Sequence, residues 1–257
     1  MRTALITGGA QGIGAAVARQ FLADGFSGVL LVDRNPERLS ITQKKLGNGV
    51  EIFAGDLRDH ATIAGSVAKA MKSFGRLDVV VNAAGNTERC GVADTTPEAF
   101  DRLFDVNVKA PLLMMQEAAK HMVVAKSGVI INIASMLAYG GPPNLATYSA
   151  SKSALMTLSR NAANTFKRDG VRVFCVNLGW AVTDGEHELQ TGFHKLPEDW
   201  AEQIGKRMPF GRLITADDVA GLCAFLVSPP AQMMTGAVID YEQMPVGTFD
   251  SHPALSP

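Results

Sequence analysis

Short runs of apolar residues, many of them β-branched, alternate along most of the chain with amphipathic stretches of ten or more residues. Continuous apolar runs are typical of strands buried on both faces, and intervening helices are typical of parallel sheets. The alternation therefore predicts an α/β fold: a single doubly wound Rossmann domain with about seven parallel strands and helices on both faces. The expected strands are residues 4–7, 29–32, 51–54, 79–81, 128–133, 172–176 and 237–240.

No linker, repeat or low-complexity stretch interrupts this alternation, which predicts one domain over residues 1–257. The alternation of apolar runs and helical stretches is interrupted at about residues 180–212, where glycine, proline, histidine and charged residues follow the sixth expected strand. Open α/β sheets bind ligands beyond the carboxyl ends of their strands, so we expect this insertion to form a substrate lid. A plain surface excursion is the alternative. A short C-terminal tail is expected at about residues 244–257.

The composition argues against several classes of function. The formal net charge is −1 at pH 7 and no basic stripe occurs, so nucleic acid is not an expected partner. No apolar stretch approaches the ~20 residues that cross a bilayer, and the first residues have a strand-and-turn pattern rather than that of a targeting peptide. We therefore expect a cytoplasmic protein that does not bind membranes. Cys90, Cys175 and Cys223 lack metal-ligand or disulfide spacing, so no metal is expected.

A glycine-rich turn, Thr-Gly-Gly-Ala-Gln-Gly-Ile-Gly, runs from Thr7 to Gly14 between the first expected strand and a helix. Glycines allow a sharp turn and close approach to a pyrophosphate, and a helix N-terminus offers free N–H groups to a phosphate. The spacing differs from the common Gly-x-Gly-x-x-Gly pattern, and a turn that binds no ligand is the alternative.

Asp33 ends the second expected strand, nineteen residues after Gly14. A carboxylate there accepts hydrogen bonds from an adenosine ribose and repels a 2′-phosphate. NAD is therefore expected as cofactor, with NADP less favoured. Arg34 weighs against this preference, because an arginine at that place attracts a phosphate.

Tyr148 and Lys152 are the ends of the segment Tyr-Ser-Ala-Ser-Lys, and Ser135 ends an apolar run thirteen residues before the tyrosine. A free phenol loses its proton only near pH ~10. A lysine four residues on lies on the same helix face, and we expect its positive charge to lower the pKa of Tyr148. Such a tyrosine serves as a general acid or base, and a nearby serine orients the reacting oxygen. Surface residues that share a helix face by chance are the alternative.

The order of these motifs resembles that of the short-chain dehydrogenase/reductase family, and the resemblance covers essentially the whole chain. Besides the motifs above, the family pattern is matched by Asp56 after the third strand, by Asn-Ala-Ala-Gly at residues 82–85, and by Asn107. The resemblance implies an NAD(P)-dependent oxidoreductase acting on CH–OH groups, and Asp33 favours an NAD-preferring member.

The resemblance implies a catalytic set of Asn107, Ser135, Tyr148 and Lys152. In this set Tyr148 is the acid/base and Ser135 holds the substrate oxygen. Lys152 binds the nicotinamide ribose and lowers the pKa of the tyrosine, while Asn107 holds a water on the path of the proton to solvent.

The resemblance also implies which residues bind the cofactor. They are Gly8, Gln11, Gly12, Ile13, Gly14, Asp33, Arg34, Asp56, Leu57, Asn82, Ala83, Gly85, Tyr148, Lys152, Ala181 and Thr183. The chain departs from the family pattern at Asn-Leu-Gly, residues 177–179, where proline is common in the middle. It departs again at Asp-Tyr-Glu, residues 240–242, where Asp-Gly-Gly is common, so that subunit packing or the far wall of the substrate pocket is expected to differ.

The substrate is expected to contact the segment between Ser135 and Tyr148 and the insertion. The candidates are Met136, Asn144, Trp180 and His187, with Tyr139, Glu186, His194 and Trp200 as further ones. Histidines, carboxylates and tryptophans in the insertion favour a polar substrate, so we expect interconversion of a secondary alcohol and a carbonyl on a sugar, polyol or hydroxy acid.

Other functions stay open at this point. One is an NADPH-dependent 3-oxoacyl-carrier-protein-type reductase, and another is a non-catalytic nucleotide-binding regulatory or scaffold protein. The resemblance further implies a homotetramer or homodimer built on long helices near residues 111–125 and 147–167.

Overall fold

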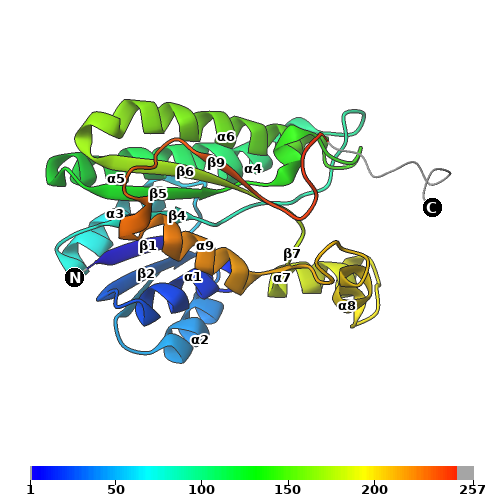
Figure 1. Cartoon of the computed structure of the whole chain (residues 1–257), viewed down its shortest axis with the longest axis horizontal. Coiled ribbons are helices and arrows are strands. Elements are labelled where there is room, and N and C mark those ends of the chain that lie inside the picture. The colour runs from blue at the N-terminus through cyan, green and yellow to red at the C-terminus, as the bar shows by residue number, and fades with distance from the viewer. Residues whose placement is uncertain (1, 248–257) are drawn as a thin grey trace.

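The computed structural model describes residues 2–247, so residues 248–257 of the expected tail lie outside the described part. Its centre is a seven-stranded sheet in the order β3-β2-β1-β4-β5-β6-β9, with every neighbouring pair parallel (Figure 1). The strands are β1 (Thr3–Thr7), β2 (Gly28–Asp33), β3 (Val50–Ala54), β4 (Val79–Asn82), β5 (Gly128–Ile133), β6 (Val171–Leu178) and β9 (Val238–Tyr241). The strand order reverses at β1, as in doubly wound folds, and the predicted fold class is confirmed.

Helices cover both faces of the sheet (Figure 1). The longer helices are α1 (Gly12–Ala23), α2 (Pro36–Leu46), α3 (His60–Phe74), α4 (Pro97–Phe104), α5 (Ala110–Ala125), α6 (Ala146–Phe166) and α9 (Ala216–Leu226). Helices α1 and α9 pack against one face, and α3, α5 and α6 against the other. Strand β1 shows why its run is continuously apolar: Ile6 faces the first layer and Leu5 the second, and both are buried.

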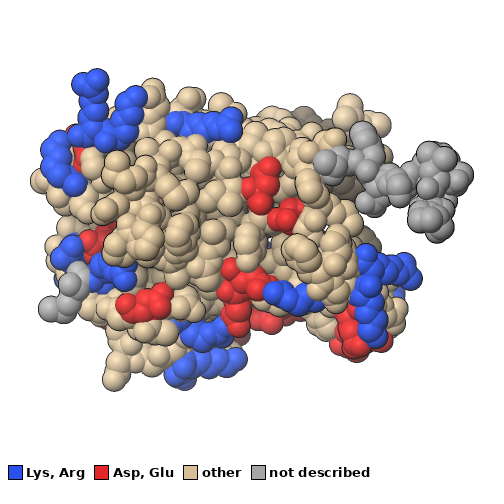
Figure 2. All heavy atoms as spheres, in the orientation of Figure 1, with Lys and Arg blue, Asp and Glu red and all other residues tan. Residues whose placement is uncertain are grey.

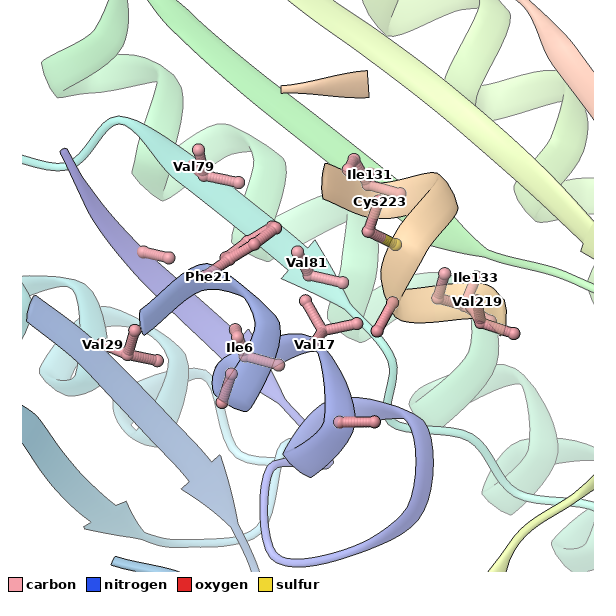
Figure 3. Close-up of a cluster of buried hydrophobic side chains, with 14 of the residues drawn as sticks. Ile6, Val17, Phe21, Val29, Val79, Val81, Ile131, Ile133, Val219 and Cys223 are labelled. Atoms are coloured by element: carbon pink, nitrogen blue, oxygen red, sulfur yellow. The ribbon is translucent and has the colours of Figure 1, made fainter. Parts of the chain in front are cut away.

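Phe21 of α1 fills the core between this helix and the sheet, and Figure 3 shows it among Ile6, Val79 and Val81. We expect Phe21→Ala to lower the free energy of unfolding by about 3–5 kcal/mol, because a fully buried ring is replaced by a cavity. Denaturant unfolding measures this loss. The control Phe210→Ala truncates a ring that is 78% exposed and should change stability by less than about 0.5 kcal/mol. Equal losses in the two variants would contradict the core position of Phe21.

The insertion at residues 180–212 has secondary structure of its own. It contains α7 (Asp184–Glu188), a π-helix η4 (Leu189–Phe193) and α8 (Trp200–Gly205). Strand β7 (Ala181–Val182), at the start of the insertion, pairs with β8 (Ile214–Thr215), just after its end, in a two-stranded ladder. Sequence reasoning missed this ladder, since two-residue strands carry no periodic signal.

Charged side chains are distributed in small mixed groups. On the face shown in Figure 2, Lys and Arg form separate clusters interspersed with Asp and Glu, without a continuous basic patch. Within residues 2–247 no helix is both long and apolar enough to cross a membrane.

Candidate active site

The glycine-rich turn lies at the carboxyl end of β1 and leads into α1. Gly8 has a positive φ of 66°, a conformation that favours glycine. A Cβ at Gly14 would lie 2.3 Å from the Gly8 carbonyl oxygen, so the turn closes only when this position is glycine. No side chain caps the N-terminus of α1, whereas Asn35 and Asp59 cap α2 and α3. The turn thus leaves helix N–H groups available to an anion.

A cavity of about 710 Å³ lies over this turn and extends along the carboxyl ends of β1 to β4. Its volume suits a nucleotide-sized ligand. Twelve of the sixteen residues expected to bind the cofactor line it: Gly8, Gln11, Gly12, Ile13, Gly14, Asp33, Arg34, Asp56, Leu57, Ala83, Gly85 and Thr183. Asn82, Tyr148, Lys152 and Ala181 do not; Asn82 instead donates to Asn132 Oδ1 in the interior, at 2.8 Å.

The two predicted carboxylates at the nucleotide end have different partners. Asp33 Oδ2 accepts from the Ala10 amide at 3.3 Å and Oδ1 from the Asn35 amide at 3.1 Å, so backbone groups fix its orientation. Asp56 accepts a side-chain hydrogen bond from Arg58 at 2.6 Å, which lowers the pKa of Asp56 and keeps it ionised. A dinucleotide fits this donor set: uncapped helix N–H groups for its phosphates and an oriented Asp33 for a ribose.

Arg38 joins three parts of the cavity wall that are distant in the sequence. Its guanidinium donates to the Gln11 side chain in the glycine-rich turn and, at 2.7 Å, to Glu188 of α7. Gly185 of α7 also abuts Gln11, since a Cβ at Gly185 would lie 3.0 Å from Gln11 Nε2. Sequence reasoning missed Arg38, because its partners are 27 and 150 residues away and no local pattern signals them.

Tyr148 and Lys152 lie one turn apart on α6 and are both buried. The lysine Nζ is 5.7 Å from the centre of the tyrosine ring, but it donates to the Ile133 carbonyl at 2.9 Å. Burial raises the pKa of Tyr148 to about 12; the Ser135 side chain opposes this shift and the charge of Glu186 adds to it. The expectation that the pKa of Tyr148 is lowered is therefore wrong for this structure. Burial also lowers the pKa of Lys152 to about 8.

Asn107 lies in a π-helix, η1 (Asp105–Lys109), between α4 and α5. Its Nδ2 donates to the Asn86 carbonyl at 2.9 Å and to Ser151 Oγ at 3.0 Å, and its Oδ1 accepts from the Asn86 amide at 2.8 Å. A Cβ at Gly85 would lie 3.7 Å from both Asn107 Oδ1 and Lys152 Nζ, so the strand end, η1 and α6 meet at one point. Such π-turns often occur at functional sites. Asn86 lines the cavity and was not predicted, although it directly follows the predicted segment 82–85.

Ser135 follows β5 and precedes a short 3₁₀ helix, η2 (Met136–Tyr139). Its Oγ accepts from the Leu137 amide at 3.2 Å, which leaves the hydroxyl proton free to be donated. Because Ser135 also acts on the pKa of Tyr148, the structure brings together the serine, the tyrosine, Lys152 and Asn107, as the sequence predicts.

None of the four predicted substrate residues lines the cavity. Met136 begins η2, and Asn144 is exposed in the loop before α6. Trp180 is 40% exposed and donates to Glu186 Oε1 at 2.8 Å. Glu186 itself does line the cavity.

His187 and Trp200 hold the insertion together. Trp200 is fully buried and donates from Nε1 to His187 Nδ1 at 3.2 Å. Since an indole N–H can only donate, Nδ1 is the acceptor, and Nε2 carries the proton that faces Glu198 at 2.9 Å. Burial thus corrects the expectation that Trp200 contacts substrate: it packs inside the insertion and stacks on Trp180, with ring centroids 5.6 Å apart.

Among residues 2–247 no three His, Cys, Asp or Glu side chains gather as a metal site requires. The three cysteines are buried, and burial raises the pKa of Cys175 to about 11 and that of Cys223 to about 12. Both thiols are therefore protonated near neutral pH and behave as core residues.

A cavity suited to a dinucleotide, next to a buried Tyr–Lys pair with a serine, defines a nicotinamide-dependent oxidoreductase of the Rossmann type. Comparison with known proteins agrees. Residues 8–242 match the family model described as enoyl-(acyl carrier protein) reductase. The chain is 35% identical to sorbitol dehydrogenase of Cereibacter sphaeroides over 237 residues, 90% of this chain and 91% of that protein.

It is also 33% identical to galactitol 2-dehydrogenase of Agrobacterium fabrum over 234 residues, 88% of this chain and 90% of that protein. Among solved structures, an NADPH-dependent reductase involved in bacilysin biosynthesis has a TM-score of 0.88 and 28% identity, with 96% of this chain and 99% of that chain covered. The chain belongs to the short-chain dehydrogenase/reductase family. It is accordingly an enzyme that acts on alcohol or carbonyl groups with a nicotinamide cofactor, rather than a non-catalytic nucleotide-binding protein.

Proposed function

We propose that the protein is an NAD(H)-dependent oxidoreductase that interconverts a secondary alcohol and a carbonyl on a polar sugar, polyol or hydroxy acid. The observation that carries the proposal is the buried pair of Tyr148 and Lys152, with Ser135 acting on the tyrosine, beside a cavity that Asp33 also lines; Gly85 of the cavity wall neighbours the Lys152 ammonium. The similarity to a sorbitol and a galactitol dehydrogenase supports a polyol-like substrate.

A nicotinamide cofactor held over the glycine-rich turn and Asp33 would supply the hydride chemistry of this reaction. Tyr148 accepts the hydroxyl proton at its phenol oxygen during oxidation and returns it during reduction. Ser135 donates a hydrogen bond to the substrate oxygen and orients it. The ammonium of Lys152 stabilises the negative charge of the phenolate, and Asn107 positions the exit path of the proton.

The proposal is tested by the absorbance of the reduced nicotinamide. NAD⁺ and NADP⁺ are each offered with a panel of sugars, polyols and hydroxy acids, and we expect turnover that is fastest with NAD⁺ and a polyol. Absence of turnover across the panel, in an enzyme that melts at a higher temperature with NAD⁺ present, would contradict the substrate class but not cofactor binding.

A reductase of 3-oxoacyl carrier thioesters is the second candidate. It is supported by the 29% identity over 241 residues to a 3-oxoacyl-[acyl-carrier-protein] reductase of Staphylococcus aureus and by the NADPH-dependent structural relative. Turnover with NADPH and a 3-oxoacyl thioester, together with failure on every polyol, would favour the carrier-thioester reductase over the polyol dehydrogenase.

The NAD preference predicts the effect of Asp33→Asn. The variant keeps the side-chain size and an acceptor for one of the two backbone contacts, but loses the charge that repels a 2′-phosphate. We expect the ratio of kcat/KM for NAD⁺ over NADP⁺ to fall about tenfold, as one charge–charge contact in a partly exposed site implies. Asp24→Asn, the same change at the exposed end of α1 and outside the cavity, should leave the ratio unaltered. An unchanged ratio in Asp33→Asn would show that this residue does not select the cofactor.

We further propose that the insertion at 180–212 covers the substrate. Gly185 and Glu186 of α7, and Thr183 just before this helix, line the cavity, which supports this role. Organisation of residues 1–257 as one domain, a homotetramer or homodimer built on α5 and α6, and a cytoplasmic location stay predictions of the sequence.

A further inference from the structure

Glu186 is the acidic side chain that the insertion places at the reacting end of the cavity. It lies in the first turn of α7 and lines the cavity together with Gly85 and Asn86, which neighbour Lys152 and Asn107. Its charge raises the pKa of Tyr148, so the carboxylate is within electrostatic reach of the phenol. A substrate held between Ser135 and Tyr148 therefore lies in the field of a negative charge.

Two side chains fix the orientation of this carboxylate. Trp180 Nε1 and Gln190 Nε2 both donate to Glu186 Oε1, each at 2.8 Å, and Gln190 is only 5% exposed. The Glu186 amide donates to Thr183 Oγ1 at 3.1 Å, which begins the helix at this place. Across residues 2–247 no group donates to Oε2 and no cation pairs with the carboxylate, so one oxygen and the charge stay available.

Cations that would balance this charge are committed elsewhere. Lys152 donates to the Ile133 carbonyl beneath the site, and His187 is held between Trp200 and Glu198. Three guanidinium groups that line the cavity are paired with other carboxylates: Arg58 with Asp56, Arg102 with Glu88, and Arg38 with Glu188 of α7. The reacting end thus carries a carboxylate without a matching cation.

Further acidic groups border the same region. Asp240 of β9 accepts hydrogen bonds from Tyr139 of η2 at 3.1 Å and from Asn177 of β6 at 2.9 Å. Glu242, which takes the place of a glycine in the family pattern, lies so close to Gly179 that a Cβ there would be 2.1 Å from its Oε2. These carboxylates add to the negative potential beyond the ends of β6 and β9.

We propose that Glu186 selects the substrate by charge: its free oxygen accepts a hydrogen bond from a hydroxyl or ammonium group near the reacting carbon, and it repels a carboxylate there. The inference rests on the proposed function and narrows it, because polyols and amino-polyols are then substrates while hydroxy acids are disfavoured. Like-charge contacts are an efficient way of rejecting a wrong ligand.

Three substrates of one carbon skeleton test the inference: a hexitol, the corresponding aldonate and the 1-amino-1-deoxyhexitol, whose amine is protonated near pH ~8. We expect the wild-type kcat/KM for the hexitol and the aminohexitol to exceed that for the aldonate by about tenfold or more. Glu186→Gln keeps the acceptor for Trp180 and Gln190 but removes the charge, and it should erase most of this difference.

The pH profile gives a readout that a merely structural role would not produce. The groups that face Tyr148 are Ser135 from the turn between β5 and η2, Lys152 from α6 and Glu186 from α7. Alcohol oxidation needs the phenolate, and Glu186 opposes its formation. Glu186→Gln should therefore shift the rise of kcat/KM for the hexitol to lower pH.

Matched variants complete the experiment. Glu202→Gln makes the same change on α8, at an exposed side chain that pairs with Lys206 away from the cavity, and should preserve the charge preference. Glu186→Asp keeps the charge and should retain the preference, and Glu186→Ala removes the charge if the amide variant fails to fold.

The outcomes separate the two proposals. Oxidation of the aldonate as fast as the hexitol by the wild type, or an unchanged preference in the charge-removing variants, overturns the role of Glu186 and leaves the proposed function intact. Failure to oxidise any of the three, with reduction of a 3-oxoacyl thioester, overturns the proposed function and the inference with it. Loss of the preference in Glu186→Gln and its retention in Glu186→Asp supports both.

Discussion

Tyr148→Phe should reduce kcat by about 10²–10⁴-fold while the enzyme still binds NAD⁺, because the change removes one oxygen and leaves the ring packed in place. Turnover is followed by the absorbance of the reduced nicotinamide, and binding by the rise in melting temperature with NAD⁺. The large loss follows from chemistry: phenylalanine has no group that exchanges a proton with the substrate oxygen. Ser135 in the variant can still hold that oxygen but cannot accept its proton as a base does.

Tyr241→Phe is the matched control for this change. Tyr241 lies on β9, and its phenol is not part of the set around Lys152. Its removal should leave kcat within a few-fold of the wild type. Near-normal turnover in Tyr148→Phe would disprove the assignment of Tyr148 as the acid/base.

Lys152→Ala should harm both catalysis and cofactor binding, with kcat/KM reduced by about 10²–10³-fold, the usual effect of removing one preorganised charge or donor. The ammonium is buried and donates to the Ile133 carbonyl, so alanine also leaves that carbonyl without its partner. With a pKa of about 8, the lysine is mostly protonated below that pH, where its charge can stabilise the phenolate. The two readouts are kcat/KM and the melting shift caused by NAD⁺.

The control for this variant is Lys167→Ala, at the end of α6, where the ammonium is exposed and donates to Asn164. We expect both readouts to match the wild type there. A Lys152→Ala enzyme with a normal melting shift would refute the part of Lys152 in binding the cofactor, even if its rate were low.

The strands were predictable because a parallel sheet buried on both faces demands uninterrupted apolar runs. Strand β5 has the expected bounds, Gly128–Ile133. Strand β6 continues two residues beyond the expected end at residue 176, since Asn177 and Leu178 pair with Asp240 and Tyr241 of β9. Polar Asn177 hides this extension in the sequence, because its side chain finds a partner in Asp240 that no local pattern reveals.

The chemistry of Tyr148 shows where sequence spacing stops being informative. A separation of four residues places Lys152 on the same helix face, and the structure agrees. Spacing does not specify how deeply the phenol is buried or which acceptor the lysine reaches. Burial outweighs the expected effect of the lysine, and the Ile133 carbonyl of β5 takes the hydrogen bond.

Contacts across the cavity were unpredictable for a similar reason. The glycine-rich turn follows from its own residues, since a Cβ at Gly14 has no room. The contact of Arg38 with Glu188 exists only once α2 and α7 are folded beside each other. Long insertions hold such contacts, and their sequences lack the periodicity that identifies strands and helices.

The bridge formed by Arg38 links the glycine-rich turn to the insertion by contacts that a ligand at either place is expected to strengthen. Gln11 belongs to the glycine-rich turn, and it contacts both Arg38 and the backbone region of Gly185. A ligand that fixes the position of the Gln11 side chain is therefore also expected to fix the position of α7, which carries Glu186. Since such coupling is reciprocal, dinucleotide and substrate are expected to tighten one another's binding through these contacts.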